Sequence, residues 1–226
     1  MGMHFGLVAA RTSVADFIDM FPKAWTKFEI IKSEANLKTR DDAVAWKQTH
    51  EEFVSAAKWS PSNPGKEVYI FWEDGPWAVM MDTSYVLASD EESLKILSKH
   101  FEKTISFVVE SAGGSACFWC FENGDLRRRI SNSNFDIDMS GDPLPEEDGI
   151  DIDGYYMDET EALCKAFGLS EINDVTPSKG FRAICVIDRT DYSVPSGNDV
   201  FASNPADSLK PKSETSTHKK PWWKIW

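Results

Sequence analysis

Apolar residues alternate with polar ones, or run together in short β-branched and aromatic stretches, along much of this chain. Residues 66–83 hold two such runs around Asp74-Gly75, a favoured tight-turn pair, and predict a β-hairpin. Residues 103–132 hold three runs that are separated by glycine-containing turns, and predict a meander. Further strands are expected at residues 3–11, 28–32 and 181–189.

Four helices are predicted where apolar residues recur three and four positions apart after a capping signal. The signals are Ser, Thr or Asp residues followed three positions later by an acidic residue. The expected helices run from Ser13 to a stop at Pro22, from Thr39 through Ala57, from Ser89 through Phe101, and from Asp158 to a C-cap at Gly168.

Strands that come in neighbouring hairpins, with helices between the groups, predict an α+β fold. We expect a mainly antiparallel sheet of about six or seven strands, with about four helices packed on it. At 226 residues, 42% of them hydrophobic, the chain is long enough to bury the core of one such domain. After Pro195 the composition shifts to Ser, Pro, Asn, Lys and Thr. We therefore expect a single domain over residues 1–194 and a flexible tail over residues 195–226.

The formal net charge of −13 is concentrated in one part of the chain. Residues 134–200 carry 16 acidic and 4 basic side chains, whereas residues 201–226 carry 2 acidic and 5 basic ones. An acidic body is a poor partner for nucleic acid. The sequence shows no run that predicts a transmembrane helix and no secretory signal, and its four cysteines lack a disulfide-framework spacing. We therefore expect a cytoplasmic protein.

The stretch DIDMSGDPLPEE has nearly the spacing of an EF-hand calcium loop. Two prolines, and the lack of flanking helical patterns, favour an acidic connector between a strand and a helix instead. A divalent-cation site is the alternative, and no other cofactor is indicated. The candidate ligands at loop positions 1, 3, 5, 7 and 12 are Asp136, Asp138, Ser140, Asp142 and Glu147.

The Cys-x-x-Cys pair Cys117 and Cys120 lies in a predicted strand, where side chains three positions apart point to opposite faces. We therefore expect buried thiols rather than a redox or zinc pair. Trp72, Trp77 and Trp119 are expected in the core, although a pocket that they line would favour an enzyme or ligand-binding protein. The sequence contains no GxSxG, HExxH or phosphate-loop motif.

Two groups of residues are candidates for binding a partner. Arg127 and Arg129 are expected to project from one face of a strand, where guanidinium groups suit a carboxylate or phosphate. Pairing with the chain's own carboxylates is the competing interpretation. The tail ends in KKPWWKIW, whose aromatic side chains are costly to leave in water. We expect Trp222, Trp223 and Trp226 to dock on the chain's own acidic surface, on another subunit, in a partner's groove, or weakly at a membrane interface.

The run CFWCFENGDLRRRI, followed by GDPLPEE and DETEALCKAFG, resembles a pattern in uncharacterised bacterial proteins. Some of these are similar to toxin-immunity or other small interaction domains. The resemblance covers roughly residues 66–170 and supplies no catalytic residues. It implies a bacterial cytoplasmic α+β domain.

Together these patterns predict a non-catalytic protein-interaction module. Its expected contact regions are the acidic residues 134–161 and the Trp-rich tail. An enzyme or small-ligand-binding protein with an aromatic-lined pocket is the alternative, and a divalent-cation-binding domain is a third.

Overall fold

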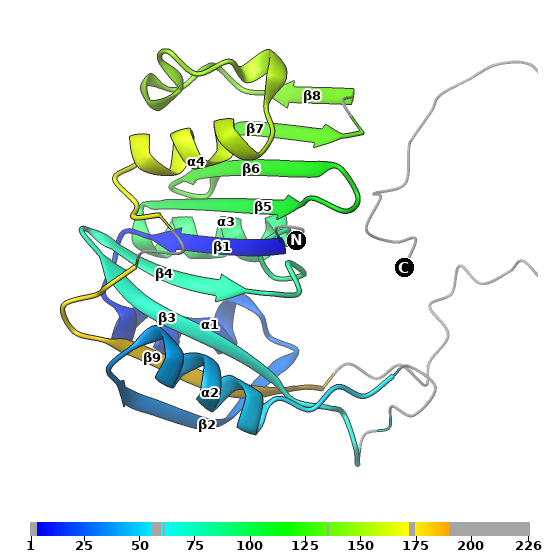
Figure 1. Ribbon diagram of the computed structural model, residues 1–226, viewed down its shortest axis with the longest axis vertical. Coiled ribbons are helices and arrows are strands. Elements are labelled where there is room, and N and C mark those ends of the chain that lie inside the picture. Colours follow the sequence, from blue (N-terminus) through cyan, green and yellow to red (C-terminus); the bar gives the residue numbers. More distant parts are fainter. Residues whose placement is uncertain (1–3, 56–59, 61, 135, 172–174, 190–226) are drawn as a thin grey trace, which may run out of the picture. The chain divides into compact units, whose positions relative to one another are not determined.

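The computed structural model describes residues 4–55, 60, 62–134, 136–171 and 175–189. These residues form one antiparallel sheet of nine strands with four helices packed on it, which confirms the predicted α+β class (Figure 1). The strands are β1 (His4–Ala10), β2 (Phe28–Leu37), β3 (Glu67–Asp74), β4 (Trp77–Asp82), β5 (Lys103–Glu110), β6 (Ser115–Glu122), β7 (Asp125–Ser133), β8 (Asp136–Ser140) and β9 (Phe181–Asp188). The helices are α1 (Val14–Ala24), α2 (Arg40–His50), α3 (Glu91–Phe101) and α4 (Met157–Ala166), with 3₁₀ turns η1 (Pro145–Glu147) and η2 (Ile152–Gly154).

The strands lie in the order β2-β9-β3-β4-β1-β5-β6-β7-β8. The predicted hairpin is β3–β4, and the predicted meander is β5–β6–β7. β9, the last described strand in the chain, lies between β2 and β3, and β1 lies at the centre between β4 and β5. β2 and β8 are therefore the two edges of the sheet.

The prediction of about six or seven strands was too low. β8 occupies residues 136–140, which the sequence analysis assigned to an acidic connector, and it pairs with β7 without a register shift. β2 was predicted only as far as residue 32 but continues to Leu37. Both edge strands are polar, and each is stabilised mainly by its neighbour in the sheet rather than by its own composition.

The second helix ends earlier than predicted. α2 begins as expected, because the Thr39 hydroxyl accepts the Asp42 N–H at 3.1 Å and the Thr39 N–H donates to the Asp42 carboxylate at 3.0 Å. It ends at His50, since the chain then turns and Glu52 exchanges two backbone hydrogen bonds with Lys66, each 2.9 Å long. Residues 51–55 had been expected to continue the helix, and that prediction was wrong, whereas Ala57, the predicted end, lies outside the described residues.

The other helices differ in smaller ways. Pro22 does not stop α1 but lies inside its last turn, and the helix continues to Ala24. α3 begins after Asp90 rather than at Ser89, and α4 begins one residue before the predicted cap Asp158. Phe53, expected on a buried helix face, is 92% exposed. None of the helices in the described ranges is long and apolar enough to cross a membrane.

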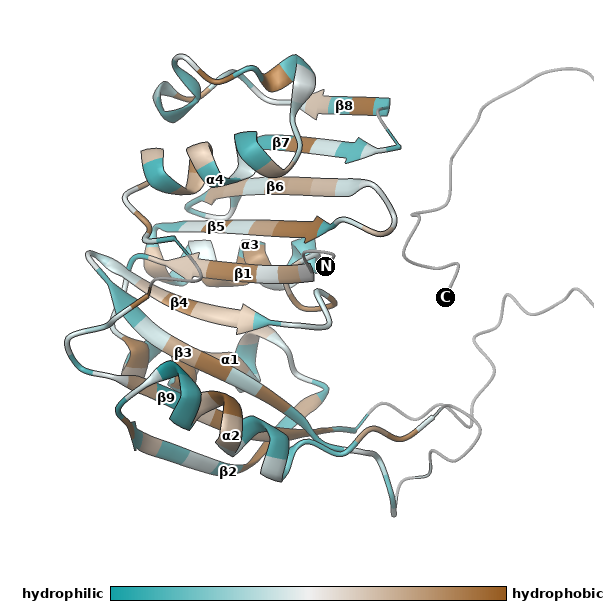
Figure 2. Ribbon diagram, viewed as in Figure 1, coloured by the Kyte–Doolittle hydropathy of each residue, from teal (hydrophilic) through white to brown (hydrophobic). Residues whose placement is uncertain are grey.

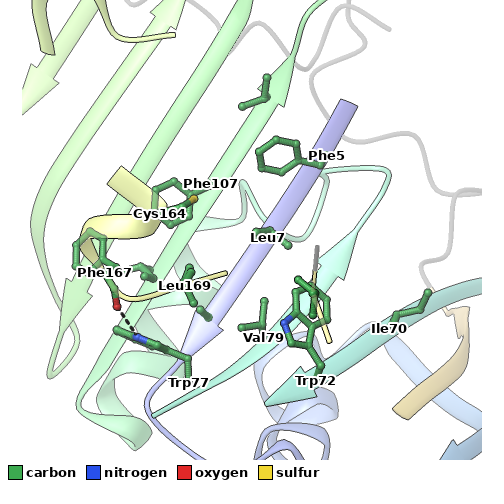
Figure 3. Close-up of a cluster of buried hydrophobic side chains, with 14 of the residues drawn as sticks. Phe5, Leu7, Ile70, Trp72, Trp77, Val79, Phe107, Cys164, Phe167 and Leu169 are labelled. Carbon is green, nitrogen blue, oxygen red and sulfur yellow. Dashed lines mark hydrogen bonds between the residues drawn. The ribbon is translucent and has the colours of Figure 1, made fainter. Parts of the chain in front are cut away.

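Helices cover both faces of the sheet, and each face has its own core (Figure 1). α2 and α4 cover one face, where Trp72, Phe107 and Phe167 belong to one buried cluster and the Trp77 Nε1 donates to the Phe167 carbonyl at 3.0 Å (Figure 3). α1 and α3 cover the other face, where Phe17 of α1 packs edge-on against Phe71 of β3. Figure 2 shows the central strands as largely hydrophobic and the tip of the loop after β8 as hydrophilic.

Candidate functional site

The chain between β8 and the first turn of α4 folds over the α4-covered face at the β6–β8 end of the sheet. We call residues 141–158 the acidic cap. The inner side of the cap is apolar, because Tyr155 is buried and Leu144, Ile150 and Ile152 pack against the core cluster. These side chains anchor a segment in which half of the remaining residues are acidic.

The centre of the cap is a buried ion pair between Arg128 of β7 and Glu147 of η1. The Arg128 Nε donates to Glu147 Oε1 at 2.9 Å, and its Nη2 donates to Oε2 at 2.8 Å, so the contact is bidentate. The two side chains are only 6% and 5% exposed. The third nitrogen of Arg128, Nη1, donates to the Gly141 carbonyl at 2.9 Å. This arginine therefore holds both ends of the first turn of the cap.

A register shift in the sheet helps to place Arg128 there. It falls between Cys120 and Phe121 of β6, so that Arg128 lies opposite Cys120 while Leu126 lies opposite Phe121. Arg128 thus shares the capped face with Ile130, whereas Leu126 is partly exposed. An arginine on the inward side of a strand signals a buried acidic partner, because an unpaired buried charge is costly. The sequence does not indicate which of the nearby carboxylates that partner is.

Three further contacts fix the cap. Gly141 has a φ of +81°, and a Cβ atom at this position would lie 2.0 Å from the Arg127 carbonyl oxygen, so only glycine fits without a backbone shift. The Asn132 Nδ2 of β7 donates to the Tyr155 carbonyl at 2.7 Å. The Lys103 Nζ of β5 lies 3.6 Å from the Glu146 carboxylate. The cap is therefore tied to the sheet at its start, middle and end.

The outer side of the cap presents a group of carboxylates. Five of them are exposed, and none forms an ion pair with any described residue: Asp142, Asp148, Asp151, Asp153 and Asp158. A negatively charged surface that a buried ion pair holds in place is suited to electrostatic recognition of a basic surface.

The candidate calcium ligands are not gathered at one point. Asp136, Asp138 and Ser140 lie on the extended strand β8 rather than in a loop, and Asp142 is an exposed residue at the start of the cap. Glu147, which the EF-hand spacing assigns as a bidentate ligand, points inward and binds Arg128. The described part of the chain contains no group of three or more His, Cys, Asp or Glu side chains placed to hold a metal ion.

The predicted partner-binding arginines already have acidic neighbours within the fold. The Arg127 Nε lies 3.4 Å from Glu122 Oε2, and Arg129 contacts the Asp138 carboxylate. The Arg129 Nη1 also lies 3.9 Å from Glu91 of α3. These contacts agree with the competing interpretation of intramolecular pairing, although both arginines stay partly exposed. Trp222, Trp223 and Trp226 lie outside the described residues, so their docking stays a prediction.

The cysteine pair lies in β6, with its two thiols on opposite faces. Cys120 belongs to the core cluster of the capped face, and the Cys117 Sγ lies 3.5 Å from the Ser131 hydroxyl. Burial raises the pKa of Cys117 to about 11 and the pKa of Cys120 to about 12, so both are protonated thiols at neutral pH. Cys164 and Cys185 are also free and buried. None of these thiols has the depressed pKa that redox catalysis uses.

The three tryptophans that were candidates for a ligand pocket do not meet in one. Trp72 and Trp77 are buried in the core cluster on the capped face. Trp119 points to the opposite face, where its Nε1 donates to the Glu91 carboxylate at 2.9 Å. Their arrangement therefore supports packing rather than an aromatic-lined pocket.

Two carboxylic acids with raised pKa values, Glu67 of β3 and Asp82 of β4, lie between the centre of the sheet and its β2 edge. Burial raises the pKa of Glu67, and the Tyr69 hydroxyl donates to its carboxylate at 2.5 Å. Burial also raises the pKa of Asp82, whose carboxylate accepts hydrogen bonds from the Ser84, Leu87 and Ala88 amides and from the Ser84 hydroxyl. Shifted groups often mark catalytic sites. Here the hydrogen bond of Glu67 lies within β3, and the hydrogen bonds of Asp82 hold the loop that follows β4.

Comparisons with known proteins add no relative. No family model matches the sequence, and no curated protein and no solved structure gives a significant match.

Proposed function

We propose that this protein is a non-catalytic interaction module that binds a basic surface of a partner protein through the acidic cap. The observation that carries the proposal is the pairing of Arg128 with Glu147, which anchors the inner side while the five outer carboxylates form no ion pair with any residue that the structure describes. Carboxylates held in fixed positions lose little freedom when a partner binds, so a larger part of the interaction contributes to affinity.

The electrostatics of the cap support the same conclusion. Five like charges on one short segment repel one another in the free protein, because exposed charges interact within a Debye length of about 8–10 Å. Basic groups from a partner relieve that repulsion and are attracted from a distance. Binding is therefore expected to weaken strongly as salt is added.

The partner class and the compartment follow as parts of this proposal. The resemblance of residues 66–170 to immunity-like bacterial domains favours a basic toxin-like protein as the partner. The four free cysteines in the described ranges favour a reducing compartment such as the cytoplasm.

The experiment compares two variants of the full chain that lose the same charge. The cap-neutralised variant carries Asp142→Asn, Asp148→Asn and Asp151→Asn, with Asp153 and Asp158 kept because they lie in the first turns of η2 and α4. The control variant removes three exposed carboxylates elsewhere that form no ion pair with a described residue: Asp19→Asn, Glu102→Gln and Asp125→Asn. Each protein is immobilised, proteins from the native host are captured and identified, and the affinity is then measured with the purified partner.

We expect the wild type and the control variant to bind the partner alike, and the cap-neutralised variant to bind at least about tenfold more weakly. Equal weakening of both variants would show that only total charge matters. Unchanged binding by the cap-neutralised variant would contradict the proposal.

A further inference from the structure

β8 is the outermost strand at one end of the sheet, next to the acidic cap (Figure 1). Its five residues pair only with β7 in the described part of the chain, and that pairing is regular from Ser133↔Asp136 to Arg129↔Ser140. An edge strand directs every second backbone N–H and C=O away from its neighbour. β8 therefore offers backbone groups to which a further strand can bind.

The two faces of β8 differ in chemistry. Asp136 and Asp138 are exposed on one face, and the Asp138 side chain is 70% exposed even though it contacts Arg129. Ile137 and Met139 lie on the other face, where Ile137 packs against the core cluster and Met139 is 40% exposed. Leu144 of the cap also packs against that cluster. Acidic and apolar positions therefore alternate along the exposed edge.

The other edge of the sheet lacks this regularity. β2 has register shifts against β9 between Ile30 and Lys32 and between Glu34 and Leu37. Its charged residues have both signs, and Lys32 donates to the His50 ring at 2.6 Å. Bulges and mixed charges are the usual means by which proteins protect an edge from pairing. β8 has no register shift and its exposed charges are acidic.

We propose that the partner binds by adding an extended segment to β8, with Lys or Arg at the positions beside Asp136 and Asp138 and apolar residues at the positions between them. This inference rests on the proposed function and adds the mode of binding. The backbone of β8 supplies hydrogen bonds, and the alternation of acidic and apolar side chains selects the sequence. A second copy of this chain fits poorly, because antiparallel pairing of two β8 strands brings Asp138 close to acidic residues of the other copy.

The test uses three capped peptides of the same charge with the ¹⁵N-labelled full chain. The first is the alternating peptide Lys-Val-Lys-Val-Lys-Val-Lys. The second is the same peptide with N-methyl groups on the central Val and the adjacent Lys, which removes amide donors on both of its edges. The third has the same composition in blocks, with the four lysines before the three valines. Binding is measured by titration, and amide hydrogen exchange reports the strand involved.

We expect the alternating peptide to bind at least about tenfold more tightly than either control peptide. Exchange should slow at the amides of residues 136–140 and stay unchanged at residues 28–37 of β2, which serve as the internal reference. Slowed exchange at β2 instead, or none at either edge, would overturn the inference. Protection of β8 that depends on protein concentration, with no peptide present, would identify a second copy as the occupant and would also overturn it.

The two proposals fail in different ways. If the three peptides bind equally and perturb only the acidic cap, strand addition is wrong while electrostatic binding through the cap keeps its support. If the partner captured by the wild type binds the cap-neutralised variant equally well, the proposed function is wrong whatever the peptides do.

Discussion

Exposed carboxylates toward the β2 end of the sheet and in the acidic cap differ in their partners. Toward the β2 end, two exposed carboxylates have basic partners: Glu29 lies 2.8 Å from Arg189, and Glu52 lies 2.7 Å from Lys66. At the β8 end, the acidic residue with a bidentate basic partner is the buried Glu147. The exposed carboxylates of the cap form no ion pair with any described residue.

Exposed ion pairs, the buried ion pair and the unpaired carboxylates of the cap have different roles in this protein. Exposed pairs such as Glu29–Arg189 contribute about 0–1 kcal/mol and mainly prevent a net charge from building up. The buried pair fixes the position of the acidic cap, because removing either group leaves the other as an uncompensated buried charge. The free charges at the β8 end are then available to something outside the chain.

The largest expected effect comes from breaking the buried pair. Arg128→Met leaves the Glu147 carboxylate buried without its partner, so we expect the free energy of unfolding to fall by about 3–5 kcal/mol in urea denaturation. Arg129→Met, which removes an exposed pair on the same strand, should cost at most about 1 kcal/mol.

A double variant sharpens this test. Arg128→Met combined with Glu147→Leu should be more stable than Arg128→Met alone, because no charge is left buried. If Arg128→Met and Arg129→Met lower the free energy of unfolding by the same amount, the buried pair is not the anchor of the cap.

A smaller effect is expected from the turn that begins the cap. Gly141→Ala places a side chain at a φ of +81° and 2.0 Å from a backbone oxygen, so we expect a loss of about 2–3 kcal/mol by the same measurement. Gly149→Ala is the matched control in the same segment. Its φ is +78° but a Cβ there has nothing within 4 Å, so the backbone conformation alone should cost about 1–2 kcal/mol. Equal losses would mean that the close approach at Gly141 relaxes freely.

The smallest expected change in stability concerns Glu67 of β3. Its hydrogen-bond partner is the Tyr69 hydroxyl instead of an arginine. Burial raises its pKa above the ordinary value of 4.5, so the folded state binds the proton more tightly than the unfolded state. The free energy of unfolding therefore falls as the pH rises from about 4.5 through the raised pKa. Glu67→Gln should weaken this pH dependence and raise stability at pH 7.

The control for this pH prediction is Glu73→Gln on the same strand. Glu73 pairs with Lys179 at 2.6 Å on the surface, so its loss should change stability by no more than about 1 kcal/mol. A pH dependence that is the same in Glu67→Gln and in the wild type would show that Glu67 does not carry it.

Local patterns in the sequence predicted the parts of the fold that depend on neighbouring residues. The Thr39 capping box, the Asp74-Gly75 hairpin and the β5–β7 meander all formed as expected. β8 was missed because two of its five residues are aspartate, so the strand exists through its pairing with β7. The position of β9 between β2 and β3 was also unpredictable, since periodicity carries no information about pairing between distant segments.

The candidate site was predicted in part. The acidic stretch was recognised as a unit, but its anchor was not, because Arg128 and Glu147 are 19 residues apart and the position of Arg128 depends on a register shift between β6 and β7. The spacing that resembled a calcium loop reflects two separate arrangements. Asp136 and Asp138 alternate along a strand, and Glu147 lies on a 3₁₀ turn that faces the sheet.

The position of β9 also has a consequence for the order of folding during synthesis. Among the strands that the structure describes, β2 pairs only with β9, and the contact of Glu29 with Arg189 joins residues 160 positions apart. At roughly 5–20 residues per second, a ribosome needs on the order of ten seconds or more to supply that partner. During this interval β3 is also an unpaired edge on the side that β9 will occupy. The seven strands β1 and β3–β8 can form their part of the sheet first. The nascent chain must then keep β2 and β3 from aggregating until β9 is inserted between them.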